Sequence, residues 1–408
     1  MKIIRSSSKK LEKIYNRSFG RSKRVEEKVK TILEDVRFAG DDALLKYTKK
    51  FDGVKMSLRQ LKVSEIEISG AYQNITPNFV SSLKVVIENV NKFYRKTIKK
   101  SWSMKDSDGV VLGEKFTPLE RVGIYIPAGT APLVSTVYMT VLPAKIAGVK
   151  KIVLISPPDK NGFINPHILV VADLLKVDEI YRVGGAQGIA ALAYGTKTIP
   201  RVDKIVGPGN AYVSEAKRQV FGYVDIDMIA GPTELVIIAN RHSEPKYIIA
   251  DLKAQAEHAG GLAILITNSK ALAKEIKSQC PDSHGSIILT GNLQEAVEIA
   301  NKIAPEHLEI LVQNPRKLVK GIRNAGAIFL GPYSPAAVGD YVAGPSHVLP
   351  TSGTARFFSG LSVSDFTRSN HIISYSKKAL ERIKEPLEKI ATIEGMSKHL
   401  DSVKARFI

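Results

Sequence analysis

Cysteine is almost absent from this chain of 408 residues, whose single cysteine is Cys280. One cysteine excludes an intrachain disulfide and a cysteine-rich zinc knuckle, and it favours a reducing compartment. Long apolar runs are lacking too, because no stretch approaches the roughly 20 apolar residues of a membrane-spanning helix. The N-terminus is charged throughout, unlike a secretory signal. We therefore expect a cytoplasmic protein with no membrane association.

Aromatic residues are also few, at 7% of the chain, whereas basic residues are in excess and give a formal net charge of +19. Residues 1–100 hold much of that excess, with 24 Lys and Arg against 11 Asp and Glu. Such charge raises nucleic-acid binding as an alternative function. However, few aromatic residues are interleaved with the basic ones, and no helix-turn-helix, zinc-finger or RNA-binding signature is present. A solvated, lysine-rich helical surface explains the charge better, so we expect no nucleic-acid partner.

The chain is longer than the size at which one hydrophobic core usually stops growing, so two core-bearing units are expected. Within residues 1–100, apolar residues recur at spacings of three and four, which predicts helices. From residue 121, short apolar strands alternate with helices, which is typical of parallel sheets with crossover helices. The expected helices of the first part are 25–38, 41–51 and 77–100, and the expected strands are 122–126, 151–156, 179–183, 203–206, 234–239, 263–267, 286–289, 308–312 and 327–330.

These elements predict an α/β fold with two tandem, doubly wound, Rossmann-like parallel sheets, a helical N-terminal region and a small helical C-terminal tail. Residues 1–22 form a basic extension that would be ordered only when docked on another surface. The remaining divisions are a helical region at 23–120 that packs with 233–364 as one α/β domain, a nucleotide-binding α/β domain at 121–232, and a tail at 365–408. The tail has one amphipathic helix, 377–392, and too little core to stand alone.

Three glycine-rich junctions lie where expected strands end, at 127–130, 184–188 and 207–210. Ligands of open parallel sheets bind beyond the carboxyl ends of the strands, so these junctions are candidates for a nucleotide site. None is a complete GxGxxG fingerprint, and each alone is equally well a tight turn. Three in successive turns of one sheet favour a pocket lined by backbone.

A second candidate site combines polar residues from distant parts of the chain. Gln255 and His258 are three apart in a helix-like run at 246–259, so their side chains share one face and could reach one cation. Asp340 and His399 would complete a shell of one carboxylate, two imidazoles and an amide oxygen. Zinc in such a shell keeps a net positive charge and acts as a Lewis acid. Taken singly, these residues are equally well a solvated helix face, a loop aspartate and an exposed tail histidine.

Ordered sequence blocks resemble the histidinol dehydrogenase family, the enzymes of the last step of histidine biosynthesis. The resemblance runs along the whole chain and is weakest in the first hundred residues. The blocks lie at 122–127, 184–187, 207–211, 230–234, 255–258, 305–308, 339–344 and 347–351. The resemblance implies a homodimeric, zinc-dependent, NAD-dependent dehydrogenase that oxidises L-histidinol to L-histidinal and then to L-histidine, with a C-terminal tail that crosses to the other subunit.

The resemblance also implies roles for particular residues. The metal-ligand positions are Gln255, His258, Asp340 and His399, and the acid/base pair is Glu306 and His307. The NAD positions are Tyr125, Gln187 and Asn210. The substrate-binding positions are Thr233, Gln255, His258, Glu306, Asp340, His347, Glu394 and His399. Three positions depart from the family pattern, because Thr233 stands for a serine, Ala128 for a glycine and Ser346 for an asparagine.

Two oxidations at one carbon need a base for the alcohol proton and then a base for the attacking water. We assign the first role to His307, because an imidazole titrates near working pH, and the second to Glu306. Adjacent residues on a regular strand point to opposite faces, so both can serve one substrate only if the backbone turns at 305–307. The alternatives are a zinc and NAD dehydrogenase of another small polar alcohol, such as a sulfonated diol, or a non-catalytic basic protein that binds nucleic acid.

Overall fold

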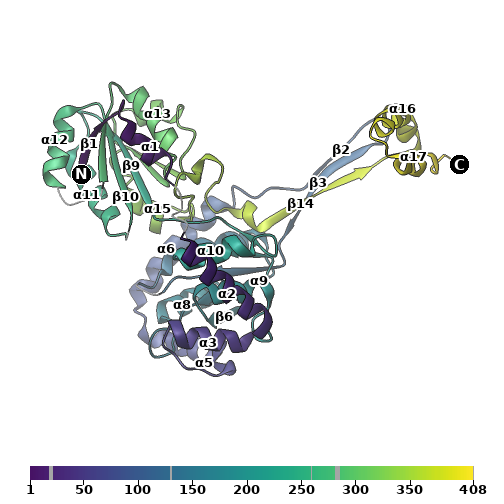
Figure 1. Ribbon diagram of the computed structural model, residues 1–408, viewed down its shortest axis with the longest axis horizontal. Helices are drawn as coiled ribbons and strands as arrows, with labels where there is room; N and C mark the ends of the chain where they lie inside the picture. Colours follow the sequence, from purple (N-terminus) through teal and green to yellow (C-terminus); the bar gives the residue numbers. More distant parts are fainter. Residues whose placement is uncertain (18–21, 129–130, 259, 281–284, 408) are drawn as a thin grey trace. The chain divides into compact units, whose positions relative to one another are not determined.

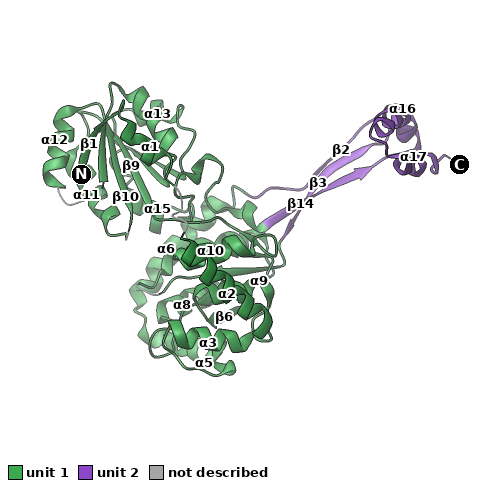
Figure 2. Cartoon of the chain, viewed as in Figure 1, with its two compact units in different colours: residues 1–97, 119–366 green, residues 98–118, 367–408 purple. Residues whose placement is uncertain are grey.

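The computed structural model describes residues 1–17, 22–128, 131–258, 260–280 and 285–407. The chain divides into two compact units, coloured separately in Figure 2. The first unit comprises Met1–Thr97 and Leu119–Phe366, and the second comprises Ile98–Pro118 and Thr367–Ile408. Within the described residues, no helix is both long and apolar enough to traverse a lipid bilayer.

One parallel sheet of the first unit has five strands in the order β6-β5-β4-β7-β8. The chain builds outward from the central strand β4 to one side and then returns to the other, so the order reverses between β4 and β7. The strands are β4 (Arg121–Tyr125), β5 (Lys151–Ser156), β6 (Glu179–Arg182), β7 (Lys204–Val206) and β8 (Asp225–Ile226), and the crossover helices are α7 (Val134–Ala147), α8 (Pro166–Leu174), α9 (Gly185–Tyr194) and α10 (Ala211–Val220).

A second parallel sheet has six strands in the order β1-β11-β10-β9-β12-β13 and the same reversal, here between β9 and β12. Figure 1 labels its strands β1, β9 and β10. Its strands are β1 (Lys2–Arg5), β9 (Glu234–Ala239), β10 (Leu262–Thr267), β11 (Gly285–Leu289), β12 (His307–Ile310) and β13 (Ala327–Leu330). Its helices are α11 (Pro245–Ala256), α12 (Lys270–Gln279), α13 (Leu293–Ile303), α14 (Pro315–Val319) and α15 (Ala336–Tyr341). The predicted fold of two tandem parallel sheets is confirmed.

The N-terminal segments attach to both sheets. β1 adds to the edge of the six-stranded sheet beside β11, so part of the expected basic extension docks on the chain's own fold. The helices that follow are α1 (Glu12–Tyr15), α2 (Lys23–Ala39), α3 (Asp41–Phe51), α4 (Leu58–Leu61), α5 (Glu65–Ala71) and α6 (Pro77–Tyr94).

The partner of these helices differs from the expectation that 23–120 packs with 233–364. The apolar stripe of α2, which includes Val29, Ile32 and Val36, is buried in one core with α9 and strands of the five-stranded sheet. α6 likewise packs on α7. The small residues of α9, such as Ala190, let a second helix layer approach closely, and this matching surface decides the partner.

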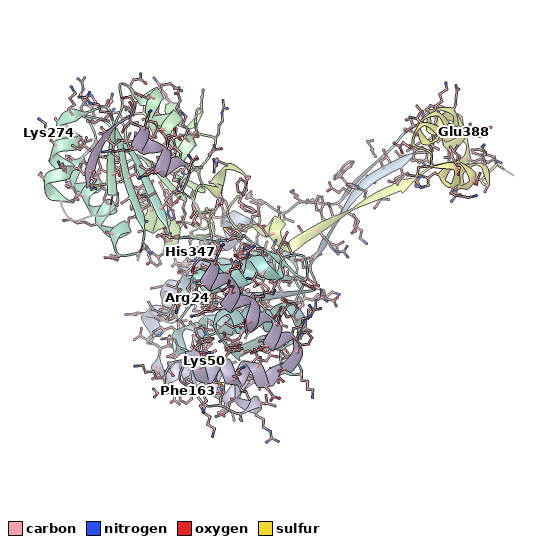
Figure 3. All side chains as sticks on the ribbon, in the orientation of Figure 1. Arg24, Lys50, Phe163, Lys274, His347 and Glu388 are labelled. Carbon is pink, nitrogen blue, oxygen red and sulfur yellow. The ribbon has the colours of Figure 1, made fainter. Side chains whose placement is uncertain are left out.

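The second unit contains an antiparallel sheet that the sequence pattern did not predict. Its strands β2 (Trp102–Lys105), β3 (Val111–Pro118) and β14 (Thr367–Ser374) pair in the order β14-β3-β2. Two helices follow β14, namely α16 (Lys377–Ile393), which carries the predicted amphipathic pattern, and α17 (Ser397–Lys404). Glu388 is labelled on α16 in Figure 3.

Candidate active site

The candidate acid/base residues lie at the amino-terminal edge of the six-stranded sheet. Thr233 directly precedes β9, and Glu306 directly precedes β12, the two strands between which the strand order reverses. His307 is the first residue of β12 and is aligned with Leu235 of β9. Ligands of open α/β sheets usually bind at the opposite, carboxyl edge, so the candidate residues lie at the less common edge.

Glu306 is buried and fixed by its neighbours on β9. Its Oε2 accepts a hydrogen bond of 3.0 Å from the backbone N–H of Glu234, and its side chain is also hydrogen-bonded to Thr233. Burial raises the pKa of Glu306 to about 7, although the charge of His307 and the two hydrogen bonds act in the opposite direction. A carboxyl group with this pKa can both accept and release a proton near neutral pH.

His307 is 5% exposed and is held from both sides of its ring. Its Nδ1 lies 3.2 Å from the backbone carbonyl of Glu234, and its Nε2 lies 3.4 Å from Oδ1 of Asp340. Burial alone would lower the pKa of His307, but contact with Asp340 and the charge of Glu306 outweigh it and raise the pKa to about 9. Because a carbonyl only accepts, Nδ1 carries a proton in both forms of the ring, and Nε2 is the nitrogen that loses its proton as pH rises through about 9 and then can act as a base.

The side chains of Glu306 and His307 lie close together, although neighbouring residues of a regular strand point to opposite faces. Nδ1 of His307 lies 3.8 Å from Oε2 of Glu306. Ala304, just before Pro305, has a φ of +48°, so the backbone turns sharply between α13 and β12. Glu306 therefore stands outside the regular strand, and its side chain reaches the side on which His307 lies.

Asp340 and His347 come from the segment after β13. Nδ1 of His347 lies 2.9 Å from the backbone carbonyl of Asp340, and its Nε2 lies 3.3 Å from Oγ1 of Thr136 on α7. Burial lowers the pKa of His347, which favours the neutral ring. Burial would raise the pKa of Asp340, but contact with His307 and the charges of His347 and His258 lower it. His347 is labelled in Figure 3.

Gln255 and His258 are close in space but not as predicted, because α11 ends at Ala256 rather than continuing to residue 259. His258 follows in a turn, where its N–H donates to the carbonyl of Gln255 at 3.3 Å. The left-handed backbone of Gly260, with a φ of +75°, continues this turn away from the helix. The two side chains therefore belong to a helix end and a turn instead of one helical face.

Gln255 offers the clearest sign of a missing partner. It is 6% exposed, and within the described residues its Nε2 has no hydrogen-bond partner. The nitrogen and oxygen of an amide exchange places by a half-turn of the group, so the amide oxygen can occupy the unpaired position. A cation beside it would satisfy this group, as would a polar substrate atom.

The residues present fit a zinc ion in part. Within the described residues, no group of three or more His, Cys, Asp or Glu side chains gathers as a metal site. The predicted set supplies His258 and Asp340 in the first unit, together with the unpaired amide of Gln255. His258 is close enough for its charge to lower the pKa of Asp340. One nitrogen, one carboxylate and one amide oxygen are donors that zinc accepts.

The two remaining candidates of the tail belong to the second unit. Glu394 directly follows α16, and His399 lies in the first turn of α17. Both residues are exposed in the part of the chain that the structure describes. Both residues belong to the second unit, whereas the other substrate and metal candidates belong to the first unit.

The candidate NAD residues lie at the carboxyl edge of the five-stranded sheet, around the reversal between β4 and β7. Tyr125 ends β4, and its hydroxyl accepts a hydrogen bond of 3.3 Å from the N–H of Gly185. Gln187 is 1% exposed, and its Oε1 has no partner among the described residues. Asn210 caps α10 by accepting from the N–H groups of Tyr212 and Val213 at 3.0 and 3.1 Å.

The third junction, at 207–210, also depends on glycine. A Cβ on Gly207 would stand 2.2 Å from the carbonyl oxygen of Tyr125, and the φ of Gly207 is +117°. Only glycine allows this close approach of two backbones. Of the first junction, at 127–130, the last two residues lie outside the described part of the chain.

Sequence reasoning missed one residue on which the site depends, Glu234. Its carboxylate is 3% exposed and forms a bidentate pair with Arg17, with nitrogen-to-oxygen distances of 2.5 and 2.7 Å. It also accepts from the N–H of Ser352 at 3.0 Å. Its backbone contacts both Glu306 and His307, so Glu234 links the N-terminal segment to the acid/base pair. The glutamate could have been suspected from its place in block 230–234, but Arg17 gives no signal in the sequence.

Comparisons with known proteins agree on one family. A family model described as histidinol dehydrogenase matches residues 15–407. The histidinol dehydrogenase of Listeria innocua is 49% identical over 403 residues, which are 95% of this chain and 94% of that protein. The histidinol dehydrogenase of Clostridium acetobutylicum is 48% identical over 396 residues, covering 93% and 91%. The crystal structure of histidinol dehydrogenase from Elizabethkingia anophelis matches with a TM-score of 0.93 at 34% identity, covering 100% of this chain and 98% of that one.

Proposed function

This chain belongs to the histidinol dehydrogenase family, and from that premise we propose that it oxidises L-histidinol to L-histidine by way of L-histidinal. The proposed reaction depends on zinc and NAD and removes four electrons in two steps. It is an oxidoreductase reaction of histidine biosynthesis, as in the relatives. The observation that carries the proposal is the buried pair of Glu306 and His307, whose side chains lie 3.8 Å apart with Asp340 beyond the imidazole.

In the first step, His307 removes the hydroxyl proton of histidinol while the adjacent carbon gives a hydride to NAD. Its Nε2 is the basic atom of the neutral ring, because the carbonyl of Glu234 keeps the proton on Nδ1. With a pKa of about 9 this neutral form is the minor one at neutral pH, so the step should become faster as pH rises. The resulting imidazolium is stabilised by the carboxylate of Asp340, 3.4 Å from Nε2. This step produces the aldehyde and one NADH.

In the second step, Glu306 takes a proton from the water whose oxygen attacks the aldehyde carbon. Attack by the deprotonated water leaves a hydrate anion, which gives its hydride to a second NAD and so becomes the carboxylic acid of histidine. A pKa of about 7 suits this role, because the ionised form is available at neutral pH and remains basic enough to accept the proton. The hydrogen bonds from Thr233 and Glu234 fix the direction of the carboxylate.

The cofactor positions follow from the two sheets. Gln255, His258 and Asp340, with His399, would hold the zinc ion, whose positive charge would fix the substrate's nitrogen atoms and so position the reacting carbon. Tyr125, Gln187 and Asn210 would contact NAD at the carboxyl edge of the five-stranded sheet. His347 and Glu394 would bind the polar ends of the substrate.

We also propose a homodimer in which the second unit of one subunit completes the site of the other. The second unit has little core of its own, since Ala379 and Ala391 are the buried residues of its long helix α16. Near the end of the same helix, Ile390 is 59% exposed and Ile393 is 86% exposed. Exposed apolar side chains on a unit with little core are typical of a surface that another subunit covers.

Mixing two inactive variants tests the shared site. The activity measured is oxidation of L-histidinal, which Glu306→Gln disables in the first unit and His399→Ala disables in the tail. If the tail crosses between subunits, a refolded equal mixture of the two variants regains about a quarter of the wild-type activity, because half of the dimers are hybrids and each has one intact site. A mixture that stays inactive although hybrids form would show that each chain completes its own site.

The proposed reaction itself is tested by assaying the purified protein with NAD and L-histidinol, L-histidinal or a sulfonated diol. We expect both histidine precursors to be oxidised and the diol to be inert. Oxidation of the diol alone would support the alternative dehydrogenase. Activity with neither class, together with steeply salt-dependent DNA binding, would support the nucleic-acid-binding alternative.

A further inference from the structure

A completely buried glutamate lies on β12, two residues after His307 of the acid/base pair. Glu309 is 0% exposed and lies in β12, between Ile237 of β9 and Phe329 of β13. A charged residue in the centre of an apolar sheet costs free energy unless it is paired or neutral. The proposed mechanism gives Glu309 no role, so its presence needs a separate explanation.

The partner of Glu309 is a second carboxyl group. Asp251 of α11 is hydrogen-bonded to the side chain of Glu309. Oε1 of Glu309 accepts a hydrogen bond of 2.7 Å from the N–H of Ala336, the first residue of α15. Within the described residues, its Oε2 has no donor. Two carboxyl groups can bond to each other only if one of them carries the proton.

Glu309 is the better holder of the proton, because it is completely buried whereas Asp251 is partly exposed. Burial raises its pKa strongly, and the neighbouring charge of Asp251 raises it further. Burial also raises the pKa of Asp251, but the hydrogen bond from Glu309 acts in the opposite direction. Glu309 therefore donates as a neutral acid, and Asp251 accepts as a carboxylate. The pair of Glu309 and Asp251 therefore carries one negative charge instead of two, which avoids repulsion between two buried carboxylates.

This pair joins the elements that carry the candidate site. Asp251 precedes Gln255 by four residues on α11, Ala336 precedes Asp340 by four residues on α15, and Glu309 follows His307 by two residues on β12. Four residues of helix rise about 6 Å, and two residues of strand rise about 6.6 Å. Both helices run antiparallel to β12. The contacts of Glu309 with Asp251 and Ala336 therefore lie at one height along the strand. Gln255, His307 and Asp340 lie together about 6 Å away, toward the start of β12.

We propose that Asp251 and Glu309 share one proton, and that this bond is a positioning device which aligns α11, α15 and β12 so that Gln255, Asp340 and His307 converge. Its role toward zinc depends on the proposed function, whereas the shared proton does not. Glu309 is a positioning residue and not a catalytic one, because it acts through the elements that it joins.

The charged groups around Glu309 come from three elements. Asp251 approaches from α11, His307 lies on the same strand, and Asp340 contacts His307 from α15. The residues beside Glu309 on β9 and β13, Ile237 and Phe329, have no charge. Among the described residues, Asp251 is thus the carboxylate whose hydrogen bond requires Glu309 to keep its proton.

Two substitutions separate the hydrogen bond from the charge. Glu309→Gln keeps an oxygen for Ala336 and replaces the O–H donor by an amide donor for Asp251, with no proton to lose. Glu309→Met has a similar volume but neither group. Asp41→Asn is the control, because it also turns a buried carboxyl into an amide but lies at the start of α3, on the five-stranded sheet. Each purified protein is measured for zinc affinity by chelator competition, for kcat with L-histidinol, and for Tm as a function of pH.

We expect Glu309→Gln and Asp41→Asn to bind zinc within about threefold of the wild type and to keep kcat, whereas Glu309→Met loses at least about tenfold in both. The shared proton of Glu309 and Asp251 is tested by measuring Tm as a function of pH on the metal-free protein. A carboxyl whose pKa is raised in the fold loses stability as pH rises, so the Tm of Glu309→Gln relative to the wild type should increase from about pH 5 to about pH 8.

Three results would overturn the inference. Equal loss in Glu309→Gln and Glu309→Met would mean that the charge of Glu309 is required. Unchanged zinc affinity and kcat in Glu309→Met would mean that the pair positions nothing. A pH-independent Tm difference between Glu309→Gln and the wild type would show that no proton is held, and this arm decides even if Glu309→Met fails to fold. A wild type that binds no zinc would instead contradict the proposed function, with the pH arm still valid.

Discussion

The backbone N–H of Glu234 donates to Oε2 of Glu306 at 3.0 Å, so the direction of the buried carboxylate is set from the neighbouring strand. The carbonyl of the same residue lies 3.2 Å from Nδ1 of His307, and one peptide position thereby orients both members of the acid/base pair. The position of Glu234 is fixed in turn by its bidentate contact with Arg17.

Replacing Arg17 by Met should therefore affect both stability and rate. The substitution leaves the carboxylate of Glu234, which is 3% exposed, without its cation. Breaking such a pair from one side typically costs about 3 kcal/mol. We expect a lower Tm and a kcat reduced by about tenfold or more, because Glu234 then no longer holds Glu306 and His307 in a fixed position. Arg17→Lys, which keeps the charge without the bidentate geometry, should fall between. An Arg17→Met enzyme with wild-type kcat would show that the contact does not orient the pair.

The pKa of Glu306 predicts a pH dependence for aldehyde oxidation. A protonated carboxyl cannot accept a proton from water, and burial raises the pKa of Glu306 to about 7. The rate of L-histidinal oxidation should therefore rise as pH increases through about 7, and Glu306→Gln should remove both the rate and this rise. The hydrogen bond from Thr233 lowers the pKa, so Thr233→Ala should move the midpoint to higher pH. A midpoint that moves to lower pH in Thr233→Ala would contradict the assignment.

The glycine-rich junction at 207–210 rests on a buried ion pair. Lys217 contacts Asp227, and the two side chains are 2% and 1% exposed. Nζ of Lys217 donates to the carbonyl of Gly207 at 2.9 Å, and Asp227 accepts from the N–H of Gly207 at 2.7 Å. Lys217→Met should cost about 3–5 kcal/mol and raise the KM for NAD, because it frees the junction beside Asn210.

A neighbouring lysine provides the control for this prediction. Lys204 pairs with Asp225, whose side chain is 52% exposed and can be solvated when the lysine is removed. Lys204→Met should therefore cost much less, about 1 kcal/mol or below. Equal destabilisation of the two variants, measured by urea unfolding, would mean that burial of the Lys217 pair has no special effect.

Tyr94 should influence substrate binding through a loop. Its buried hydroxyl accepts from the N–H of Ser346 at 2.7 Å and donates to the carbonyl of Leu361 at 2.7 Å. Tyr94→Phe leaves a buried N–H next to His347 without a partner, which costs about 1–3 kcal/mol. We expect a higher KM for L-histidinol with a smaller change in kcat. Tyr72→Phe, which removes an exposed hydroxyl bonded to Asp173, should change neither, and parity of the two variants would count against the loop's role.

The parallel sheets could be predicted from the sequence because their signals are local. A buried parallel strand is a short apolar run, as in β9 and β10, and its crossover helix follows within the same stretch of chain. The antiparallel sheet of the second unit was missed because β3 pairs with β14, a strand about 250 residues later in the chain. The partner of such a strand is not encoded in its own pattern.

The candidate site shows the same division. The junctions at 184–188 and 207–210, which contain Gln187 and Asn210, were predicted near one another by the rule for strand ends, which needs only the order of the elements. The NAD roles of Tyr125, Gln187 and Asn210 were implied by the family resemblance alone. Gln255 and His258 were predicted on one helical face, but the helix stops between them because the chain turns at Gly260. The contacts of Glu234 with Arg17 and of Glu309 with Asp251 depend on tertiary packing, and no spacing in the sequence announces them.

The central claim, a four-electron oxidation that uses both Glu306 and His307, is tested most directly by counting NADH formed per L-histidinol consumed. The measurement is made on the purified protein, after removal of metal with a chelator and again after addition of zinc. The account predicts two NADH per substrate, lost on chelation and restored by zinc. One NADH per substrate would contradict the role given to Glu306, and no NADH at all would contradict the proposed function.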